Sequence, residues 1–373
     1  MGSVVPVRRS TTEVIRLRRG PGGCHDRAVM DTSAIVIGAG QAGIATALAL
    51  QERGLRPLVL EAADDTAGSW PHYYDSLRLF TPAHLDGLPG RPFPGDPNRY
   101  PTRDEVAEYL RQCAKELTVR TGQRVHMVSR IDGGYRVQTT EGADFTASVV
   151  IAASGMFGNP HRPNIPALNT YTGKVMHSAD YRSPEAFAGQ RVVVIGSGNS
   201  AFQIAVELAS HAEVILASRT PLRYATTEPI PADSRFWRVL SLAARLPAGR
   251  FFHSGTIPII DTNGHRELID GGQLEVAEMF ATAEGTDLRW PDGRTTRVDV
   301  VILATGYRPA LQYLDDLITL DAAGFPQHRH GVSTTHRGLA FIGLEYQRSI
   351  LSGTLHGVGR DSHYLARRLS RHL

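Results

Sequence analysis

Two glycine-rich segments are the parts of the sequence whose residue types and spacing point most directly to chemistry. The first, at residues 38–43, has the pattern GxGxxG and follows an apolar run at 34–37. In such a turn the first glycine permits a tight bend, the second lets the backbone approach a pyrophosphate, and the third lets the next helix pack closely. The helix N-terminus offers free N–H groups to the phosphates. Glu61 stands where these sites place an acid that binds a ribose hydroxyl. The sequence therefore predicts a dinucleotide site.

The second segment, at residues 196–201, repeats the pattern after the apolar run 191–195, with Ala201 in place of the third glycine. The next apolar run ends in Ser218 and Arg219, so no acid stands at the position that favours NAD. An arginine there can bind a 2′-phosphate through charge-assisted hydrogen bonds. We therefore predict a second dinucleotide site that prefers NADPH to NADH. The alternative interpretation of Arg219 is an ordinary surface arginine.

The segments around both motifs alternate between strand-like and helix-like patterns, which is typical of a doubly wound α/β architecture. The uncharged stretch 32–51 is nearly long enough to span a bilayer, but the glycines in its middle favour a strand, a turn and a buried helix. Residues 71–101 are rich in proline and glycine and predict a long ordered loop. A helix should follow, because Thr102 and Glu105 form a capping box. Further strands are expected over 57–61, 125–128, 135–139 and 149–154.

We expect an α/β fold with two doubly wound Rossmann-type domains, the NADPH-binding domain being inserted into the other. The strand at 149–154 leads into a proline-rich stretch at 160–166, and the return is expected near 300–306. The predicted organisation is a disordered extension over 1–29, the first part of one domain over 30–156, the inserted NADPH-binding domain over 157–298, and the return segment over 299–373.

Composition limits the class of protein. The 373 residues suffice for two domains, and a net charge of +3 is too small to indicate nucleic-acid binding. The arginines from Arg8 to Arg27 are interpreted as part of a disordered, solvated N-terminal extension. This extension contains no apolar stretch of the kind that a secretory signal requires, so we do not interpret it as one. Cys24 and Cys113 form neither a CxxC pair nor a zinc site, and we expect a reducing, cytoplasmic location. The oligomeric state cannot be predicted.

Three other groups of residues are weighed as sites. The histidines His328, His330 and His336 are interpreted as solvated surface, because no cysteine or carboxylate pair accompanies them. We therefore expect no metal. The adjacent acids Asp64 and Asp65, and Asp315 and Asp316, are interpreted as surface turns. Residues 236–246 carry apolar side chains at helical spacing, and we expect them to be buried against the NADPH-binding domain. A cap over a lipophilic substrate channel, or contact with a membrane surface, is the less favoured alternative.

A longer pattern at residues 171–182 fits the motif FxGxxxHxxxY/F, with Tyr171 in place of the first phenylalanine. Together with the ATG triplet at 304–306 it makes the chain, from about residue 33 to 368, resemble the class B flavin-dependent monooxygenases. The YUCCA-like branch and the bacterial flavoproteins linked by name to potassium transport are the most similar. Tyr181 stands where Baeyer–Villiger members have tryptophan, which favours the YUCCA-like side. Weaker matches are the GxW element at 68–70, the segment 100–102 before the capped helix, and 357–361, which resembles a flavin-contacting turn.

The resemblance implies that the first site binds FAD, the second binds NADPH, and the reduced flavin forms a C4a-(hydro)peroxide sheltered by NADP⁺. It implies that His177 and Asn199 lie near the nicotinamide or the domain interface. For His177 a purely structural role between the domains stays equally open. The flavin-facing loop 77–82 lacks the asparagine that many members carry, so that residue's role in oxygen activation is not transferred.

The predicted catalytic residues are Arg78, Thr81, His177 and Asn199. The predicted cofactor-binding residues are Gly38, Gly40, Gln41, Gly43, Glu61, Ser69, Trp70, Arg78, Val125, Ser154, Gly155, Gly196, Gly198, Asn199, Ser200, Arg219, Thr305, Gly306, Gln347 and Val358.

These observations predict an NADPH-dependent FAD monooxygenase that inserts one oxygen atom from O2 into a small organic substrate. One alternative is a reductase that passes electrons from NADPH to a quinone or another small acceptor; the missing CxxC argues against a disulfide reductase. Another is a non-catalytic redox sensor or transport regulator. No nucleic-acid partner is expected. The substrate cannot be predicted, because specificity depends on a pocket assembled from distant loops.

Overall fold

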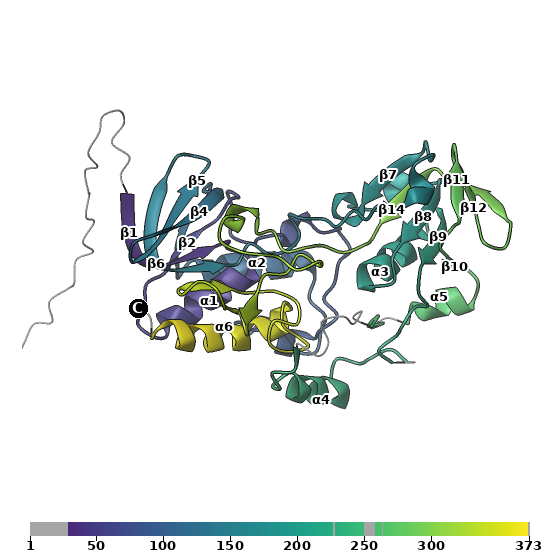
Figure 1. The fold of residues 1–373 in the computed structure, drawn as a ribbon. Helices are drawn as coiled ribbons and strands as arrows, with labels where there is room; N and C mark the ends of the chain where they lie inside the picture. The colour runs from purple at the N-terminus through teal and green to yellow at the C-terminus, as the bar shows by residue number, and fades with distance from the viewer. Residues whose placement is uncertain (1–28, 227, 250–257, 263, 372–373) are drawn as a thin grey trace, which may run out of the picture.

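The computed structural model describes residues 29–226, 228–249, 258–262 and 264–371, which form two lobes (Figure 1). The first lobe holds the start and the end of the described chain, and the second lobe holds the part between them. The predicted N-terminal extension, with its arginines and Cys24, lies outside the described residues apart from Val29 in the first strand.

The first lobe is built on a nine-stranded sheet whose middle strands run parallel in the order β17-β6-β1-β2-β3. Parallel strands are covered on both faces, which explains the uninterrupted apolar runs at 34–37 and 58–60. The antiparallel β4–β5 hairpin extends the sheet beside β6. The strands are β1 (Val29–Ile37), β2 (Leu58–Leu60), β3 (Thr118–Arg120), β4 (Val125–Ile131), β5 (Gly134–Thr139), β6 (Asp144–Ala152), β15 (His328–Arg329), β16 (Val332–Ser333) and β17 (Leu339–Phe341).

Among the described residues, the chain segments that carry this sheet also form the α-helices α1 (Gln41–Gln51), α2 (Arg103–Ala114) and α6 (Leu355–Leu369). Residues 42–50 of α1 are all buried. Thr46 in α1 shares a hydrogen bond of 3.1 Å with Ser362 in α6. The prediction of a strand, a turn and a buried helix over 32–51 is therefore confirmed. In the part of the chain that the structure describes, no helix is both long and apolar enough to cross a bilayer.

The predicted long loop connects β2 to α2. It contains only two short 3-10 helices, η1 (Trp70–His72) and η2 (Ala83–Leu85). The predicted capping box is present at its end: the Thr102 hydroxyl accepts from the Glu105 N–H, and the Glu105 carboxylate accepts from the Thr102 N–H.

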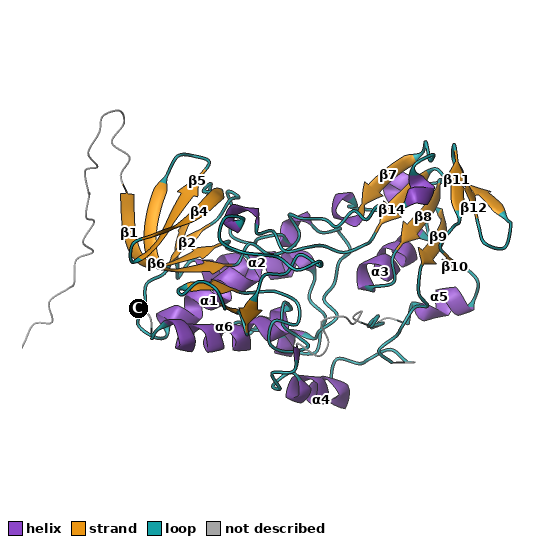
Figure 2. Cartoon of the chain, in the orientation of Figure 1, coloured by secondary structure: helices purple, strands orange, loops and turns teal. Residues whose placement is uncertain are grey.

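The second lobe contains a parallel five-stranded sheet in the order β10-β9-β8-β14-β7. It carries α3 (Asn199–Leu208), and it also holds α5 (Arg266–Asp270) and an antiparallel three-stranded sheet (Figure 2). All of its strands lie in the chain between β6 and β15, so the predicted fold class, with one domain inserted into the other, is confirmed. The strands are β7 (Lys174–His177), β8 (Arg191–Ile195), β9 (Glu213–Ser218), β10 (Glu275–Glu278), β11 (Thr282–Glu284), β12 (Asp287–Arg289), β13 (Thr295–Arg297) and β14 (Val300–Leu303).

The boundary expected at residue 299 is wrong by one strand. β14 lies within the second sheet, paired in parallel with both β7 and β8, and does not begin the return to the first lobe. The sequence of a short apolar strand does not indicate which strands will pair with it, so residues 300–303 are compatible with either sheet. The two connections between the lobes run side by side after it. The Ala310 N–H donates to the Gly155 carbonyl at 3.0 Å, and the Arg308 N–H donates to the Asn159 carbonyl at 2.9 Å.

Helix α4 (Arg235–Ala243) corrects a second expectation. It lies between β9 and β10 in the chain but packs on the first lobe, below both sheets in Figure 1. The Arg360 guanidinium donates to the Ser241 carbonyl at 2.9 Å, and His356 shares a hydrogen bond of 3.0 Å with the Ser241 hydroxyl. The predicted burial of residues 236–246 against the NADPH-binding domain is therefore wrong. Helical spacing indicates an apolar face, but it does not say which partner covers that face.

Candidate cofactor-binding and active site

The first glycine turn joins β1 to α1 and needs glycine at both ends. Gly38 has a φ of +108°, and a Cβ there would stand 2.6 Å from the Ala153 carbonyl oxygen. A Cβ on Gly43 would stand 1.8 Å from the Gly38 carbonyl oxygen. These two glycines are required by the packing of the protein itself.

Gly40, between them, is different. A Cβ at this position would have only the Gly68 Cα nearby, at 3.6 Å, which is an ordinary contact. Gly40 is also the N-cap of α1, where no side chain caps the helix. The fold therefore has no steric need for glycine at this position. A bare backbone at a helix N-terminus is what the close approach of a pyrophosphate needs.

Glu61 follows β2 and lies beside the same turn. Its side chain is buried, and it accepts hydrogen bonds from the Ala39 N–H at 2.5 Å and the Ala63 N–H at 2.9 Å. A carboxylate can accept about four hydrogen bonds. Two backbone N–H groups fix its orientation and leave acceptor capacity for ribose hydroxyls, so the residues present fit an adenine dinucleotide.

Gln41 connects three segments around this turn. Its amide donates to the Gly353 carbonyl at 2.8 Å and accepts from the Trp70 indole at 3.0 Å. The predicted residues Gln41, Ser69 and Trp70 are thereby brought together with the segment that precedes α6. Ser154, two residues after β6, instead donates to the Ala310 carbonyl at 2.6 Å and holds the two interlobe connections together. Val125 begins β4, in the hairpin at the edge of the sheet.

The C-terminal segment departs from the expected flavin-contacting turn. Residues 357–361 lie inside α6, which begins at Leu355, and Val358 is fully buried in the core. Gln347, before this helix, is also buried. Its side-chain oxygen accepts from the Leu344 N–H at 3.3 Å, whereas its amide nitrogen has no hydrogen-bond partner among the described residues. A buried donor of this kind calls for an acceptor, such as a bound cofactor would supply.

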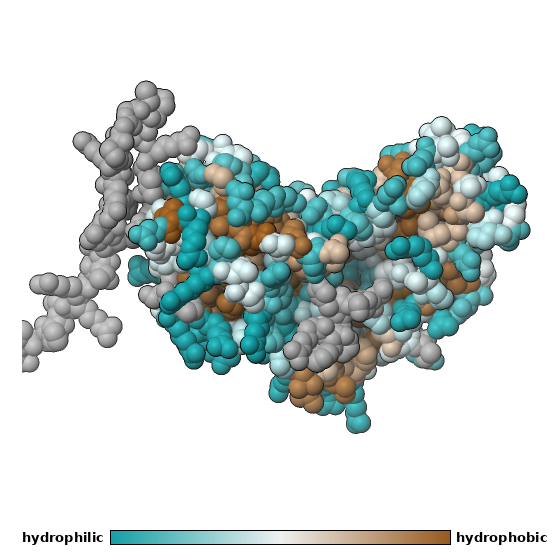
Figure 3. All heavy atoms as spheres, in the orientation of Figure 1, coloured by the Kyte–Doolittle hydropathy of each residue, from teal (hydrophilic) through white to brown (hydrophobic). Residues whose placement is uncertain are grey.

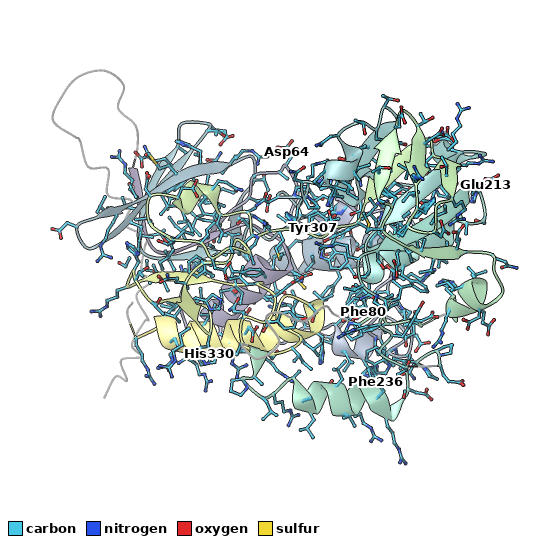
Figure 4. The ribbon with its side chains drawn as sticks, turned by 45° about the vertical axis from the view of Figure 1, so that its right-hand side comes forward. Asp64, Phe80, Glu213, Phe236, Tyr307 and His330 are labelled. Carbon is cyan, nitrogen blue, oxygen red and sulfur yellow. The ribbon has the colours of Figure 1, made fainter. Side chains whose placement is uncertain are left out.

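The loop 77–82 separates two residues that the sequence placed together. Arg78 is exposed, and its guanidinium donates to the Tyr100 carbonyl at 3.4 Å. Thr81 is buried and donates its hydroxyl to Asp86 at 2.7 Å. Figure 4 places Phe80 of this loop toward the region between the lobes.

Asp86 is a buried acid that the sequence analysis did not single out. It is 0% exposed, and in the part of the chain that the structure describes its second carboxylate oxygen has no hydrogen-bond partner. Burial raises the pKa of Asp86 to about 8, and the hydrogen bond from Thr81 opposes that rise. The carboxyl group is therefore protonated at neutral pH. A lone acid in a proline-rich loop resembles a turn residue, so no sequence signal identified it.

The second glycine turn joins β8 to α3 and resembles the first: packing requires its first glycine, whereas its second glycine has room for a side chain. A Cβ on Gly196 would stand 2.4 Å from the Ala304 carbonyl oxygen, whereas a Cβ on Gly198 would meet no atom of the described residues within 4 Å. Gly198 is the N-cap of α3, again without a side-chain cap. Ser200 and Arg219 are exposed on this lobe, and Arg219 directly follows β9. The turn fits a second dinucleotide.

Asn199, the first residue of α3, is already engaged by protein backbone. Its side-chain oxygen accepts from the Ile260 N–H at 2.9 Å, and its amide donates to the Pro258 carbonyl at 3.3 Å. The side chain therefore anchors the segment 258–262 beside the helix N-terminus. A catalytic role for Asn199 stays a prediction.

His177 ends β7 and is fully buried. Its Nδ1 accepts from the Ala179 N–H at 3.0 Å, which assigns the ring proton to Nε2, the donor to the Gly306 carbonyl at 3.1 Å. Burial and the nearby Arg162 lower the pKa of His177, so the ring is neutral. Both ring nitrogens form hydrogen bonds with backbone groups. This favours a structural role for His177 between the domains, which the sequence analysis left open. Thr305, beside Gly306, donates to the His161 carbonyl at 2.6 Å.

The motif around His177 is a packing unit. A Cβ on Gly173 would stand 2.2 Å from the Tyr171 hydroxyl, which explains the glycine of the motif. Tyr181, at its end, is fully buried and donates to Glu207 of α3 at 2.8 Å. Burial and that carboxylate raise the pKa of Tyr181 above its ordinary value. The aromatic residue that distinguishes the branches is thus part of the second lobe's core.

An aromatic cluster lies where the lobes meet. Phe157 stacks on Tyr307 with ring centroids 5.4 Å apart, and Tyr73 meets Phe157 edge-on at 4.7 Å. Tyr307 also meets His177 edge-on at 5.1 Å, and Figure 4 shows it between the lobes. The candidate active site is therefore apolar and aromatic on the side of the interlobe connections.

The candidate metal site of three histidines does not assemble. Within residues 29–371, as far as they are described, no three histidine, cysteine, aspartate or glutamate side chains gather as a ligand set. The Nδ1 of His328 accepts from the Gly331 N–H at 3.1 Å, and His330 packs on Tyr364.

Comparisons with known proteins agree with this geometry. A family model described as pyridine nucleotide-disulphide oxidoreductase matches residues 35–231. An uncharacterised CzcO-like oxidoreductase of Geobacillus kaustophilus is 32% identical, over 91% of this chain and 98% of its own. The rice (Oryza sativa) indole-3-pyruvate monooxygenase YUCCA1 is 30% identical, over 88% and 91%. A flavin-containing monooxygenase structure from Stenotrophomonas maltophilia superposes with a TM-score of 0.81, at 29% identity over 91% and 98%. These similarities, like the two turns, imply flavin and nicotinamide cofactors.

Proposed function

Because the chain belongs to the pyridine nucleotide-disulphide oxidoreductase family and to the class B flavin-dependent monooxygenases, we propose that it is an NADPH-dependent FAD monooxygenase. It would insert one oxygen atom of O2 into a small organic substrate. NADPH, a proton, O2 and the substrate would then give NADP⁺, water and the oxygenated product. The observation that carries the proposal is the pair of glycine turns, one in each lobe, each with a bare second glycine at a helix N-terminus.

The first lobe would hold FAD and the second NADPH. Gly40 and the start of α1 would receive the FAD pyrophosphate, Glu61 the adenosine ribose, and the free amide of Gln347 an acceptor on the cofactor. When bound, the flavin supplies the redox chemistry, accepting hydride from NADPH and reducing O2. The protein supplies orientation: His177 fixes the Gly306 carbonyl, and the aromatic cluster of Tyr73, Phe157 and Tyr307 excludes water where the lobes meet.

Arg219 would select NADPH over NADH. Burial and the positive charges of Arg308 and Arg219 lower the pKa of His161, so cationic groups gather at this end of the second sheet. We expect Arg219→Ala to weaken NADPH binding by about 1.5–3 kcal/mol, the range for hydrogen bonds to charged groups. That is roughly ten- to more than a hundredfold. NADH lacks the phosphate, so its binding should change little.

The ratio of catalytic efficiencies with the two coenzymes, in wild type and variant, measures this selection. The exposed Arg223 offers a matched control, and Arg223→Ala should leave the ratio unchanged. An equal loss for both coenzymes in Arg219→Ala would mean that Arg219 supports the fold and does not bind the phosphate. A shifted ratio in the Arg223 variant alone would transfer the role to that residue.

The oxygen atom itself provides the test of the proposed reaction. The holoenzyme is incubated with NADPH and isotopically labelled O2, together with thioethers, amines, ketones and 2-oxo acids. We expect one class to yield a product carrying one labelled atom, with product and hydrogen peroxide together accounting for the NADPH consumed. Rapid anaerobic reduction of a quinone, without a labelled product from any class, would favour the reductase alternative.

A further inference from the structure

Helix α4 presents some of its large apolar side chains to solvent. Val239 is 67% exposed and Leu242 is 62% exposed, and Leu246 in the turn after the helix is 62% exposed. Val239 and Leu242 are three positions apart, so they lie within about 60° of each other on a helix of 3.6 residues per turn. Phe236, three positions earlier, extends the same stripe. We call these four residues the α4 apolar face; Figure 3 shows it as a brown surface at the lower end of the molecule.

The opposite side of α4 is firmly attached, so the exposure is built into the fold. Trp237 is fully buried, and its indole donates to the Pro231 carbonyl at 3.0 Å. Ser241, an uncharged polar residue of the helix, points inward: its hydroxyl shares a hydrogen bond of 3.0 Å with His356, and its carbonyl accepts from Arg360 at 2.9 Å. A polar group faces the protein while leucine and valine face water, the reverse of an ordinary surface helix.

The charged residues of α4 and of the turn after it are all arginines, and the nearest acid in the sequence is the exposed Asp233, just before the N-cap Ser234. Arg235, Arg238 and Arg245 are exposed on or directly after α4, and the sequence from 234 to 249 contains no acid. Arg238 lies four residues before Leu242, so it flanks the apolar stripe on the same side of the helix. Exposed apolar side chains bordered by arginines match a surface that offers both acyl chains and anionic phosphates.

We propose that α4 binds the surface of an anionic lipid membrane. Val239, Leu242 and Leu246 enter the boundary between headgroups and acyl chains, and the three arginines contact lipid phosphates. A second copy of this chain fits less well, because twofold pairing of two α4 helices would place arginines against arginines. One nine-residue helix is also far smaller than a stable protein interface requires. The expectation that membrane contact is unlikely rested on burial of this helix, which the structure does not show.

Vesicle sedimentation of the full-length holoenzyme tests the proposal. We expect binding to phosphatidylcholine vesicles that contain phosphatidylglycerol, weakened by added salt, and little binding to phosphatidylcholine alone. The double variant Val239→Ser, Leu242→Ser should lower binding about tenfold or more. The variant Arg238→Gln, Arg245→Gln should reduce binding to phosphatidylglycerol vesicles toward the level of the neutral vesicles.

Leu320→Ser is the matched control, because Leu320 is 39% exposed on the surface of the first lobe and has no arginine neighbour in sequence. It should bind vesicles like the wild type. Flavin content and melting temperature should be the same in all variants, since the substituted side chains face solvent. Equal binding to both kinds of vesicle, or equal binding by wild type and the double variant, would overturn the proposal. A wild-type dimer that the double variant converts to a monomer would also overturn it, by placing a second copy on this face.

Discussion

Gly40→Ala should give a folded protein that binds FAD far more weakly and still binds NADPH, and Gly198→Ala should give a yellow protein that binds NADPH far more weakly. In each case the added methyl fits against the described residues, with its nearest neighbour at 3.6 Å for Gly40 and none of their atoms within 4 Å for Gly198. It would nevertheless keep the pyrophosphate from the N–H groups at the start of α1 or α3. Losing such charge-assisted hydrogen bonds costs about 1.5–3 kcal/mol, roughly ten- to more than a hundredfold in affinity.

Each variant is the control for the other. Flavin absorbance per folded protein measures the first site, and titration with NADP⁺ measures the second. Gly43→Ala adds a third comparison, because its methyl would lie 1.8 Å from the Gly38 carbonyl oxygen and should destabilise the fold itself. Loss of both cofactors from either of the first two variants, with the fold intact, would contradict the assignment of one cofactor to each lobe.

Asp86→Asn should stabilise the protein increasingly as the pH rises from about 5 to 8. The pKa of Asp86 is raised to about 8 in the folded protein by burial, whereas an unfolded aspartate titrates near pH 4. Between these values the folded state holds one more proton, so wild-type stability falls with rising pH by about 1.4 kcal/mol per pH unit from this group. Asparagine mimics the neutral carboxyl group and removes that slope.

Urea unfolding at a constant excess of FAD, repeated across this pH range, gives the free energy of unfolding for both proteins. The difference between them should widen up to about pH 8 and then level off. Thr81→Val is a second test, because the Thr81 hydroxyl lowers the pKa of Asp86. In the Thr81→Val background, the difference in free energy of unfolding between the proteins with and without Asp86→Asn should therefore level off at a higher pH. A difference between wild type and Asp86→Asn that does not change with pH would show that the carboxyl group stays ionised when folded.

The sequence predicted best the features that depend on neighbouring residues. The turn at 38–43, Glu61 beside it, and the capping box of α2 each follow from local backbone requirements, and the structure has all three. The nesting of one domain in the other also followed from the order of strands and turns along the chain.

Features that depend on distant partners were missed or misplaced. β14 was assigned to the wrong sheet, because the sequence of an apolar strand does not indicate which strands will pair with it. The sequence did not predict that α4 turns apolar side chains to solvent. That orientation depends on the contact of Ser241 with His356, more than a hundred residues away in the chain. Asp86 became notable only because folding buries it without a full set of partners.

The site residues show the same division. Sequence placed His177 at the domain interface, but the two backbone partners of its ring, Ala179 and Gly306, come from different segments and became visible only in the fold. Arg78 and Thr81 are three residues apart in one loop, yet one is exposed and the other buried. The sequence motifs therefore indicated where the candidate site lies. The role of each residue in that site depends on tertiary contacts that only the structure shows.

Anaerobic mixing of the FAD-loaded protein with NADPH, followed by oxygen, tests the central claim most directly. We predict that NADPH bleaches the flavin faster than NADH does, and that oxygen restores the oxidised spectrum through a distinct species that persists while NADP⁺ is bound. Arg219→Ala should remove the advantage of NADPH in the first step. A flavin that NADPH does not reduce, or one that returns directly to the oxidised spectrum with every substrate tried, would contradict an NADPH-dependent monooxygenase.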